Sequence, residues 1–150
     1  MPTKTPRVAL IGRANVGKSS LFNRMIEEQK SLVSDIPGTT RDRFESDCLW
    51  RGHVIRLIDT GGLDANRLNE IEANIIEQAE IAIKDADAIF FVVDLTAPPS
   101  PEDFTIAHKL KILKKPVIVL GNKADNAAIR NAINDSVWRA WPLALPLPVS

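Results

Sequence analysis

Residues 12–20 have the sequence Gly12-Arg-Ala-Asn-Val-Gly-Lys-Ser-Ser20. It fits G-x-x-x-x-G-K-S/T, the pattern of a phosphate-binding loop. The apolar run 7–11 comes directly before it and predicts a buried strand, and residues 21–26 carry apolar side chains at helical spacing directly after it. A strand, a glycine-rich turn and a helix are the setting that this motif requires, so a chance match is disfavoured.

The residue types in this loop indicate how it would hold phosphate. Glycines at positions 12 and 17 let the backbone curl until successive N–H groups point at one anion, and the following helix adds the positive end of its dipole. Lys18 would neutralise the β and γ phosphates of a nucleotide, and the Ser19 hydroxyl would ligate Mg²⁺. The predicted phosphate-binding residues are Gly12, Arg13, Ala14, Asn15, Val16, Gly17, Lys18, Ser19 and Ser20.

The length and composition are those of a single globular domain, and its net charge favours neither anionic nor cationic partners. The chain has 150 residues, of which 45% are hydrophobic and 25% charged, and 19 basic residues balance 19 acidic ones. A neutral domain has no overall field that would draw it to nucleic acid or to a membrane surface. The single Cys48 cannot form an internal disulfide, and no apolar stretch approaches the length of a membrane span. We therefore expect a cytoplasmic protein that does not act at a membrane.

Hydrophobic periodicity predicts alternating strands and helices along the rest of the chain. The predicted elements are a polar loop over 31–43, a hairpin of strands 44–50 and 54–58, a helix from Leu68 to Ala86, a strand over 88–93, a helix from a Ser100 cap to Lys115, a strand over 117–120, a short helix over 126–138, and at most a short edge strand after Trp141. This alternation predicts an α/β fold with a mostly parallel sheet and helices on both faces. Ligands of such sheets bind at the carboxyl ends of the strands.

Two further segments follow predicted strands and should meet the phosphate loop at that edge. The first is Asp59-Thr60-Gly61-Gly62. Asp59 stands where P-loop proteins place the carboxylate that supports Mg²⁺, and Gly62 would let the backbone approach a γ-phosphate. An aspartate followed by glycines is also an ordinary turn. The order of the motifs along the chain favours the functional interpretation.

The second segment, Asn122-Lys123-x-Asp125, indicates which base is bound. A carboxylate at Asp125 can accept hydrogen bonds from both N1–H and the exocyclic amine of guanine. Adenine offers an acceptor at N1 and would leave that charge unpaired. Asn122 and Lys123 would pack over the base and tie back to the phosphate loop. The pattern therefore favours guanine nucleotides and argues against an ATP-using P-loop kinase.

Four stretches are shared with a known group of proteins. They are 12–23, with Gly-Arg-Ala-Asn-Val-Gly-Lys-Ser-Ser-Leu-Phe-Asn, 35–43, with Asp-Ile-Pro-Gly-Thr-Thr-Arg-Asp-Arg, 59–62 and 122–125. On these stretches the chain resembles the TrmE–Era–Der group of translation-factor-type GTPases, and most of all the first GTP-binding domain of the bacterial Der family. Asp-Thr-Gly-Gly at 59–62 separates the Der pattern from Asp-Thr-Pro-Gly in Era-like proteins. Ala14 departs from the family, which usually has proline there.

The resemblance implies a P-loop G domain that binds GTP and GDP with Mg²⁺ and hydrolyses GTP to GDP and phosphate as a conformational switch. Thr40 matches the switch threonine that ligates Mg²⁺ only while a γ-phosphate is present. The implied metal ligands are Ser19, Thr40 and Asp59, and the implied catalytic residues are Asn15, Lys18, Thr40 and Gly62.

The resemblance also implies that the chain is part of a longer protein. The family's fifth motif, which caps guanine with backbone groups, would begin at Ser150, and a last helix would follow it. We therefore expect 1–150 to be one G domain at the N-terminal end of a multidomain chain that acts in biogenesis of the large ribosomal subunit. The implied partners are ribosomal particles, bound through the full-length protein. Sequence-specific nucleic-acid binding by this domain itself is not expected.

Leu63 bears on the rate of hydrolysis. Many small GTPases orient the attacking water with a glutamine directly after the last glycine of Asp-x-x-Gly, and an isobutyl group cannot form that hydrogen bond, so slow intrinsic hydrolysis is expected. Asn15 matches the asparagine through which related GTPases hold potassium, although an ordinary solvated loop residue is the alternative. Two other functions stay open: a nucleotide-gated binding module with negligible hydrolysis, and another GTPase of the same group that acts on RNA.

Overall fold

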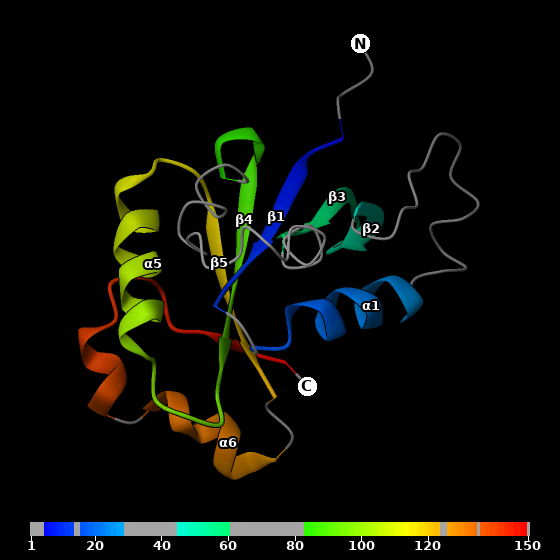
Figure 1. Ribbon diagram of the computed structural model, residues 1–150. Coiled ribbons are helices and arrows are strands. Elements are labelled where there is room, and N and C mark those ends of the chain that lie inside the picture. The colour runs from blue at the N-terminus through cyan, green and yellow to red at the C-terminus, as the bar shows by residue number, and fades with distance from the viewer. Residues whose placement is uncertain are drawn as a thin grey trace, which may run out of the picture.

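The computed structural model describes residues 5–13, 16–28, 45–60, 83–123, 126–134 and 136–149 (Figure 1). Its strands are β1 (Arg7–Ile11), β2 (Glu45–Trp50), β3 (His53–Asp59), β4 (Ala88–Asp94), β5 (Val117–Asn122) and β6 (Leu147–Pro148), and its α-helices are α1 (Lys18–Glu28), α5 (Pro101–Ile112) and α6 (Ala127–Asn131) within these ranges. Among the described residues the strands form a six-stranded sheet in the order β2-β3-β1-β4-β5-β6. β2 pairs with β3 antiparallel, and the remaining pairs of this sheet are parallel. The expected mostly parallel sheet is confirmed.

The predicted hairpin of β2 and β3 is confirmed, and its two-residue turn has the positive φ angles of type I′. Trp50 pairs with His53, so Arg51 and Gly52 form the turn, with φ angles of 51° and 82°. Hairpin turns of type I′ require positive φ at both of these positions, which glycine adopts without strain. The Arg51 guanidinium lies 5.6 Å from the centre of the Trp50 ring, and this cation–π contact offsets part of the strain in the Arg51 backbone.

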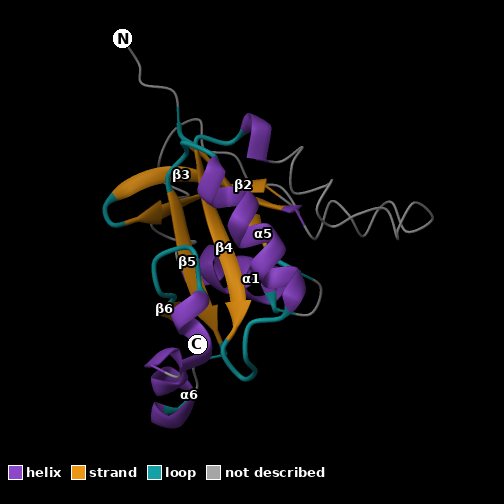
Figure 2. Ribbon diagram, turned by 90° about the vertical axis from the view of Figure 1, so that its left-hand side faces the viewer, coloured by secondary structure: helices purple, strands orange, loops and turns teal. Residues whose placement is uncertain are grey.

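Helices cover both faces of the sheet, α5 on one face and α1 on the other (Figures 1 and 2). The central strand β4 lies between β1 and β5 and is buried from Ile89 to Val93. Its side chains alternate, so that Phe91 belongs to the apolar cluster under α5 while Phe90 belongs to the cluster under α1. Burial from two sides explains why this strand has a continuous apolar sequence instead of an alternating one.

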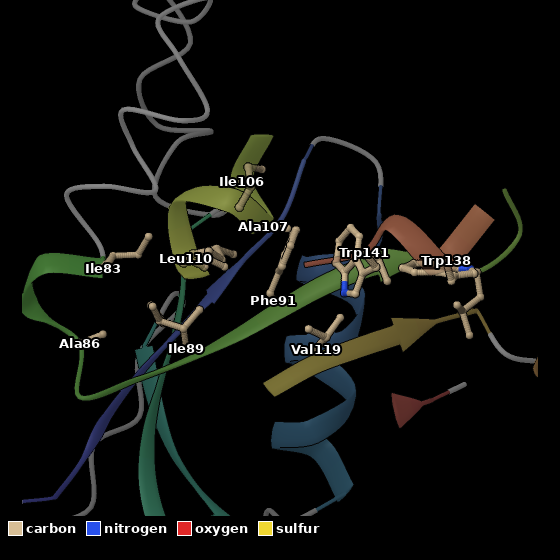
Figure 3. Close-up of a cluster of buried hydrophobic side chains, with 14 residues drawn as sticks. Ile83, Ala86, Ile89, Phe91, Ile106, Ala107, Leu110, Val119, Trp138 and Trp141 are labelled. Carbon is tan, nitrogen blue, oxygen red and sulfur yellow. The ribbon is translucent and has the colours of Figure 1, made fainter. Parts of the chain in front are cut away.

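The cluster under α5 is closed by aromatic residues from near the C-terminus. Ile106 and Leu110 of α5 pack with Phe91, and Trp138 and Trp141 lie on the other side of that ring (Figure 3). The Trp141 ring stacks on Phe91 with 5.7 Å between centroids and meets Trp138 edge-on at 4.9 Å. Such offset and edge-on pairs add about 0.5–1.5 kcal/mol each beyond the area that they bury. Residues after α6 are therefore part of the core.

The helix α5 begins as predicted, with Ser100 as its N-cap and Pro101 in its first turn. The Ser100 hydroxyl accepts a hydrogen bond from the Asp103 N–H at 3.1 Å, and the Asp103 carboxylate accepts one from the Ser100 N–H at 2.9 Å. This reciprocal capping box satisfies backbone donors that no preceding turn can satisfy. The helix ends at Ile112, ahead of Pro116, as the sequence requires.

The single short helix predicted over 126–138 is wrong. Asn126 caps α6, but α6 ends at Asn131, and two 3-10 turns over 132–134 and 136–140 follow it. The asparagines that end these pieces favour caps and turns over helix interiors, because their side chains compete for backbone hydrogen bonds. The predicted edge strand near the C-terminus is confirmed as β6, which pairs with β5.

Other predicted elements lie partly or wholly outside the described residues. The loop over 31–43 does so entirely. Of the helix predicted from Leu68, the structure describes only its end, where residues 83–85 are helical and Ile83 and Ala86 are buried. No helix in the described ranges is long and apolar enough to cross a membrane.

The thiol of Cys48 lies in β2 and is fully buried against the cluster under α1. Burial raises its pKa to about 12, and the neighbouring charge of Asp47 adds to the effect. Because the thiolate is the reactive form, we expect no alkylation by iodoacetamide at pH 8 in the folded protein and complete alkylation in denaturant. Mass spectrometry checks this, and alkylation of the folded protein at the rate of a free thiol would contradict the buried position of β2.

Candidate functional site

The carboxyl ends of β1, β3, β4 and β5 meet at one edge of the sheet. Leu10 near the end of β1 is in register with Asp59 of β3, and Asp94 at the end of β4 is in register with Asn122 of β5. The phosphate loop starts directly after β1. The described parts of the three sequence motifs are therefore brought to the same edge, as the alternation of elements predicts.

Both motif glycines of the phosphate loop stand where no side chain fits. A Cβ at Gly12 would lie 2.6 Å from the carbonyl oxygen of Val92, which belongs to the rigid centre of β4. At Gly17 the φ angle is 91°, and a Cβ would collide with the side-chain amide of Asn122. The loop thus packs directly on β4 and on the end of β5, and glycine at both positions is a geometric requirement.

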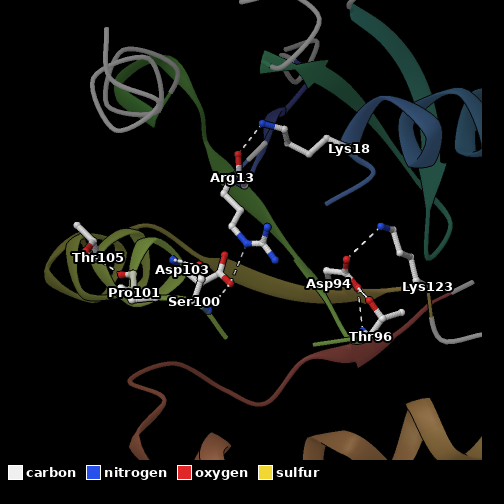
Figure 4. A network of polar contacts seen from close by, with 10 residues as sticks. Arg13, Lys18, Asp94, Thr96, Ser100, Pro101, Asp103, Thr105 and Lys123 are labelled. Atoms are coloured by element: carbon white, nitrogen blue, oxygen red, sulfur yellow. Dashed lines mark hydrogen bonds and ion pairs between the residues drawn. The ribbon is translucent and has the colours of Figure 1, made fainter. Parts of the chain in front are cut away.

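Lys18 is the first residue of α1, and its side chain folds back over the loop. Its ammonium donates a hydrogen bond to the carbonyl of Gly12 at 2.5 Å (Figure 4). Leu21 N–H donates to the carbonyl of Gly17 at 2.9 Å, which closes the first turn of α1. The positive charge of Lys18 and the N-terminal end of an eleven-residue helix therefore lie next to the same loop, a combination that favours an anion.

Asn122 joins the predicted base motif to the phosphate loop. Its side-chain amide donates to the carbonyl of Val16 at 2.9 Å, and the residue is 6% exposed. Asn122 is the last residue of β5, because this strand extends beyond its predicted end at Leu120. The predicted tie between this motif and the loop is confirmed for Asn122.

Lys123 pairs with an aspartate that the sequence interpretation missed. Its φ angle is 65°, and its ammonium lies 3.0 Å from the carboxylate of Asp94 (Figure 4). Burial opposes ionisation of Asp94, but the hydroxyl and N–H of Thr96 and the charge of Lys123 outweigh it and lower the pKa of this carboxyl. The signal was present in the sequence, since Asp94 directly follows the buried run 88–93 and so reaches the same edge.

Asp59 has the features of a cation-supporting carboxylate. It is 3% exposed, and its Oδ1 atom is buried without a hydrogen-bond partner among the described residues. The neighbouring Thr60 donates its hydroxyl to the carbonyl of Leu10 at 2.8 Å and so pins the end of β3 to β1. An anionic oxygen with unused acceptor capacity beside a phosphate-type loop fits a bound divalent cation or its water shell. Ser19, the other described member of the predicted metal set, is exposed on the first turn of α1.

Arg13 makes a contact that sequence reasoning did not anticipate. Its Nε donates to the Asp103 carboxylate at 3.2 Å, which connects the phosphate loop to the start of α5 (Figure 4). Nothing in the local sequence pairs two residues so far apart. Several predicted site residues lie outside the described part of the chain, namely Ala14, Asn15, Thr40, Gly61, Gly62, Leu63, Asp125 and Ser150.

A family described as 50S ribosome-binding GTPase matches residues 7–123. The chain is 46% identical to GTPase Der of Lactobacillus helveticus over 97% of its own length and 33% of that protein, and 47% identical to GTPase Der of Symbiobacterium thermophilum over 81% and 26%. It therefore spans about a third or less of these relatives.

Solved structures share the fold. Era in complex with MgGDPNP and nucleotides of 16S ribosomal RNA superposes with a TM-score of 0.65 at 28% identity, over 99% of this chain and 51% of Era. The FeoB G-domain of Methanococcus jannaschii gives 0.63 at 25% identity, over 99% and 88%. With the phosphate loop, Asp59 and Asn122 in the positions described, the chain belongs to the 50S ribosome-binding GTPase family.

Proposed function

We propose that this chain binds guanine nucleotides at the carboxyl edge of the sheet and hydrolyses GTP to GDP and phosphate. One observation carries the proposal: the hydrogen bond from Asn122 to the carbonyl of Val16 makes the phosphate loop and the base motif one packed unit. A site that holds phosphates at one end and a base at the other needs both ends fixed relative to each other.

The phosphate end of the site would act mainly through electrostatics. Backbone N–H groups of the loop and the start of α1 would face the phosphates, and the Lys18 ammonium, which contacts Gly12 in this structure, would move to the β and γ oxygens. Ser19, Asp59 and Thr40 would hold Mg²⁺, and the unpartnered buried oxygen of Asp59 supports this fit. When bound, the ion neutralises charge on the β and γ oxygens.

The base end of the site would select guanine through Asp125. This carboxylate would accept two donors of guanine, while Lys123, held by Asp94, would lie along the ring. Ser150 would supply the start of the fifth motif, whose backbone groups cap the base. The lowered pKa of Asp94 keeps its charge beside Lys123 at acidic pH values where an ordinary aspartate begins to take up a proton.

The switch would reside in the two segments that follow the loop helix and β3. Thr40 would bind the Mg²⁺ ion only while the γ-phosphate is present. When the γ-phosphate is lost, Gly61 and Gly62 would release the residues that follow them. Leu63 offers no hydrogen bond to water, so the intrinsic rate is expected to be slow.

The description of the matching family, 50S ribosome-binding GTPase, supports a proposed role in biogenesis of the large ribosomal subunit. We propose that the chain is the N-terminal G domain of a longer cytoplasmic protein, and that ribosomal particles are the partners of that protein, without membrane contact or sequence-specific nucleic-acid binding by this domain. A titration with fluorescent GDP and ADP tests the function. Binding of GDP with ADP excluded supports it, and equal binding of both would overturn the guanine assignment.

Potassium is expected to accelerate hydrolysis through Asn15. Charge moves toward the β–γ bridge as the bond breaks, so a cation held there lowers the barrier, and no glutamine at position 63 supplies this help. Potassium sheds its hydration shell more readily than sodium and suits a carbonyl-lined site. We expect turnover in potassium to exceed turnover in sodium by about tenfold or more, on the scale of one electrostatic group.

The matched variant for this effect is Asn15→Ala, in which the difference between the two ions should vanish while GDP affinity changes little. Phosphate release is measured at constant magnesium and ionic strength. Identical turnover in potassium and sodium for the unaltered protein would contradict this prediction, and Asn15 would then be an ordinary loop residue.

A further inference from the structure

We propose that Arg13 is a positioning residue: by binding the buried carboxylate of Asp103, it fixes the start of the phosphate loop against α5 in the geometry that receives phosphate. The inference rests on the proposed function, because it takes residues 12–20 to be the phosphate-binding segment. It concerns a side chain that extends from the loop to the start of α5, a different element of the fold (Figure 4).

The contact between Arg13 and Asp103 is short and largely shielded from solvent. Nε of Arg13 donates to Oδ2 of Asp103 at 3.2 Å, and the two side chains are 21% and 1% exposed. A pair with a fully buried member is little screened by salt and water, in contrast to an exposed ion pair. Figure 4 shows the Arg13 side chain extending to α5 while the Lys18 side chain lies on the opposite side of the loop.

Asp103 depends on Arg13 for charge compensation. The same Oδ2 atom accepts the Ser100 N–H at 2.9 Å, and Oδ1 is buried with no hydrogen-bond partner in the described ranges. Arg13 is the cation that contacts Asp103 in the described part of the chain. A buried carboxylate deprived of its cation is strongly unfavourable, so the pair resists separation and holds the loop to the rigid end of α5.

The peptide between Gly12 and Arg13 is the start of the phosphate loop, and several elements of the fold hold it in place. Gly12 lies so close to the carbonyl of Val92 that no Cβ fits there. The carbonyl of Gly12 accepts a hydrogen bond from the Lys18 ammonium. Arg13 follows directly, so the peptide between the two residues is held by β4, by α1 and, through Asp103, by α5. A loop held in its binding geometry before the anion arrives loses less conformational freedom on binding.

A double-mutant cycle on nucleotide affinity tests this role. Arg13→Gln and Asp103→Asn should each weaken GDP binding by about tenfold, a typical size for coupling between sites. The double variant should be no weaker than the weaker single variant, because both substitutions remove the same contact. Arg13→Lys retains the charge and should recover part of the affinity, whereas a purely structural role would show only in thermal stability.

The matched control is Ser100→Ala, which removes the other half of the capping box and leaves the Asp103 carboxylate in place. It should lower the melting temperature while GDP affinity stays within about twofold, since an N-cap contributes to helix stability and not to the loop. Arg13→Gln with unchanged GDP affinity, or full additivity in the double variant, would overturn the inference. If Arg13→Gln does not fold, the loss of GDP affinity in Asp103→Asn is compared with that in Ser100→Ala, and equal affinities of these two variants would overturn the inference. Failure of the unaltered protein to bind GDP would instead overturn the proposed function, and this inference with it.

Discussion

Replacing Lys18 with alanine should reduce affinity for GTP and GDP by about 2–5 kcal/mol, the cost of removing one partner of a desolvated charge pair. This corresponds to roughly thirtyfold to several thousandfold. The ammonium already lies over the loop through its bond to Gly12, so the site is charged before the nucleotide arrives. Its loss leaves the phosphates with backbone donors and the helix dipole alone. Titration with fluorescent nucleotide measures the effect.

The control for this prediction is Lys111→Ala. Lys111 is exposed in the last turn of α5, away from the loop, and it carries the same charge. We expect nucleotide affinity to be unchanged in this variant, and the melting temperature to be close to that of the unaltered protein in both. If Lys18→Ala bound nucleotide as tightly as Lys111→Ala, the loop would not be the phosphate site.

Asp125→Asn is expected to change which base the protein prefers. An amide in place of the carboxylate keeps one acceptor and adds a donor, so guanine loses a charged partner for its two donors. Xanthine carries a carbonyl where guanine has its amine, and that carbonyl gains a donor. GTP affinity should fall by about 2–5 kcal/mol, and xanthosine triphosphate should become the better ligand.

Competition between the two triphosphates for a fluorescent analogue measures this preference directly. Asp94→Asn is the informative comparison, because it removes the charge that holds Lys123 without altering the residue assigned to the base edge. It should weaken both nucleotides without exchanging their order. An Asp125→Asn protein that still binds GTP as tightly as the unaltered chain would show that another residue reads the base.

The framework of the fold could be predicted because it rests on local patterns. The buried runs 7–11 and 88–93 are apolar throughout, and the Ser100 cap with Pro101 marks a helix start by backbone chemistry alone. Each pattern is decided within a few residues, and the alternation of strand and helix then sets the edge at which the motifs gather. The tie from Asn122 to the loop followed from the same reasoning.

What the sequence could not supply are contacts between distant residues and the details of weak helices. Arg13 and Asp103 are 90 positions apart, and each has an ordinary local interpretation, one as a loop residue and the other as a capping residue. Their pairing depends on how α5 packs on the sheet. The break after Asn131 follows from small differences between helix and turn preferences, which packing decides. Asp94 could have been found by applying the strand-end rule to every strand.

Hydrolysis of GTP at this site can be measured as release of inorganic phosphate by the purified protein. The substrate is GTP or ATP, in a buffer of magnesium and potassium. We expect slow but measurable release from GTP, none from ATP above background, and none from GTP with Lys18→Ala. Release from ATP at the same rate as from GTP, or release from GTP that survives Lys18→Ala, would contradict this expectation.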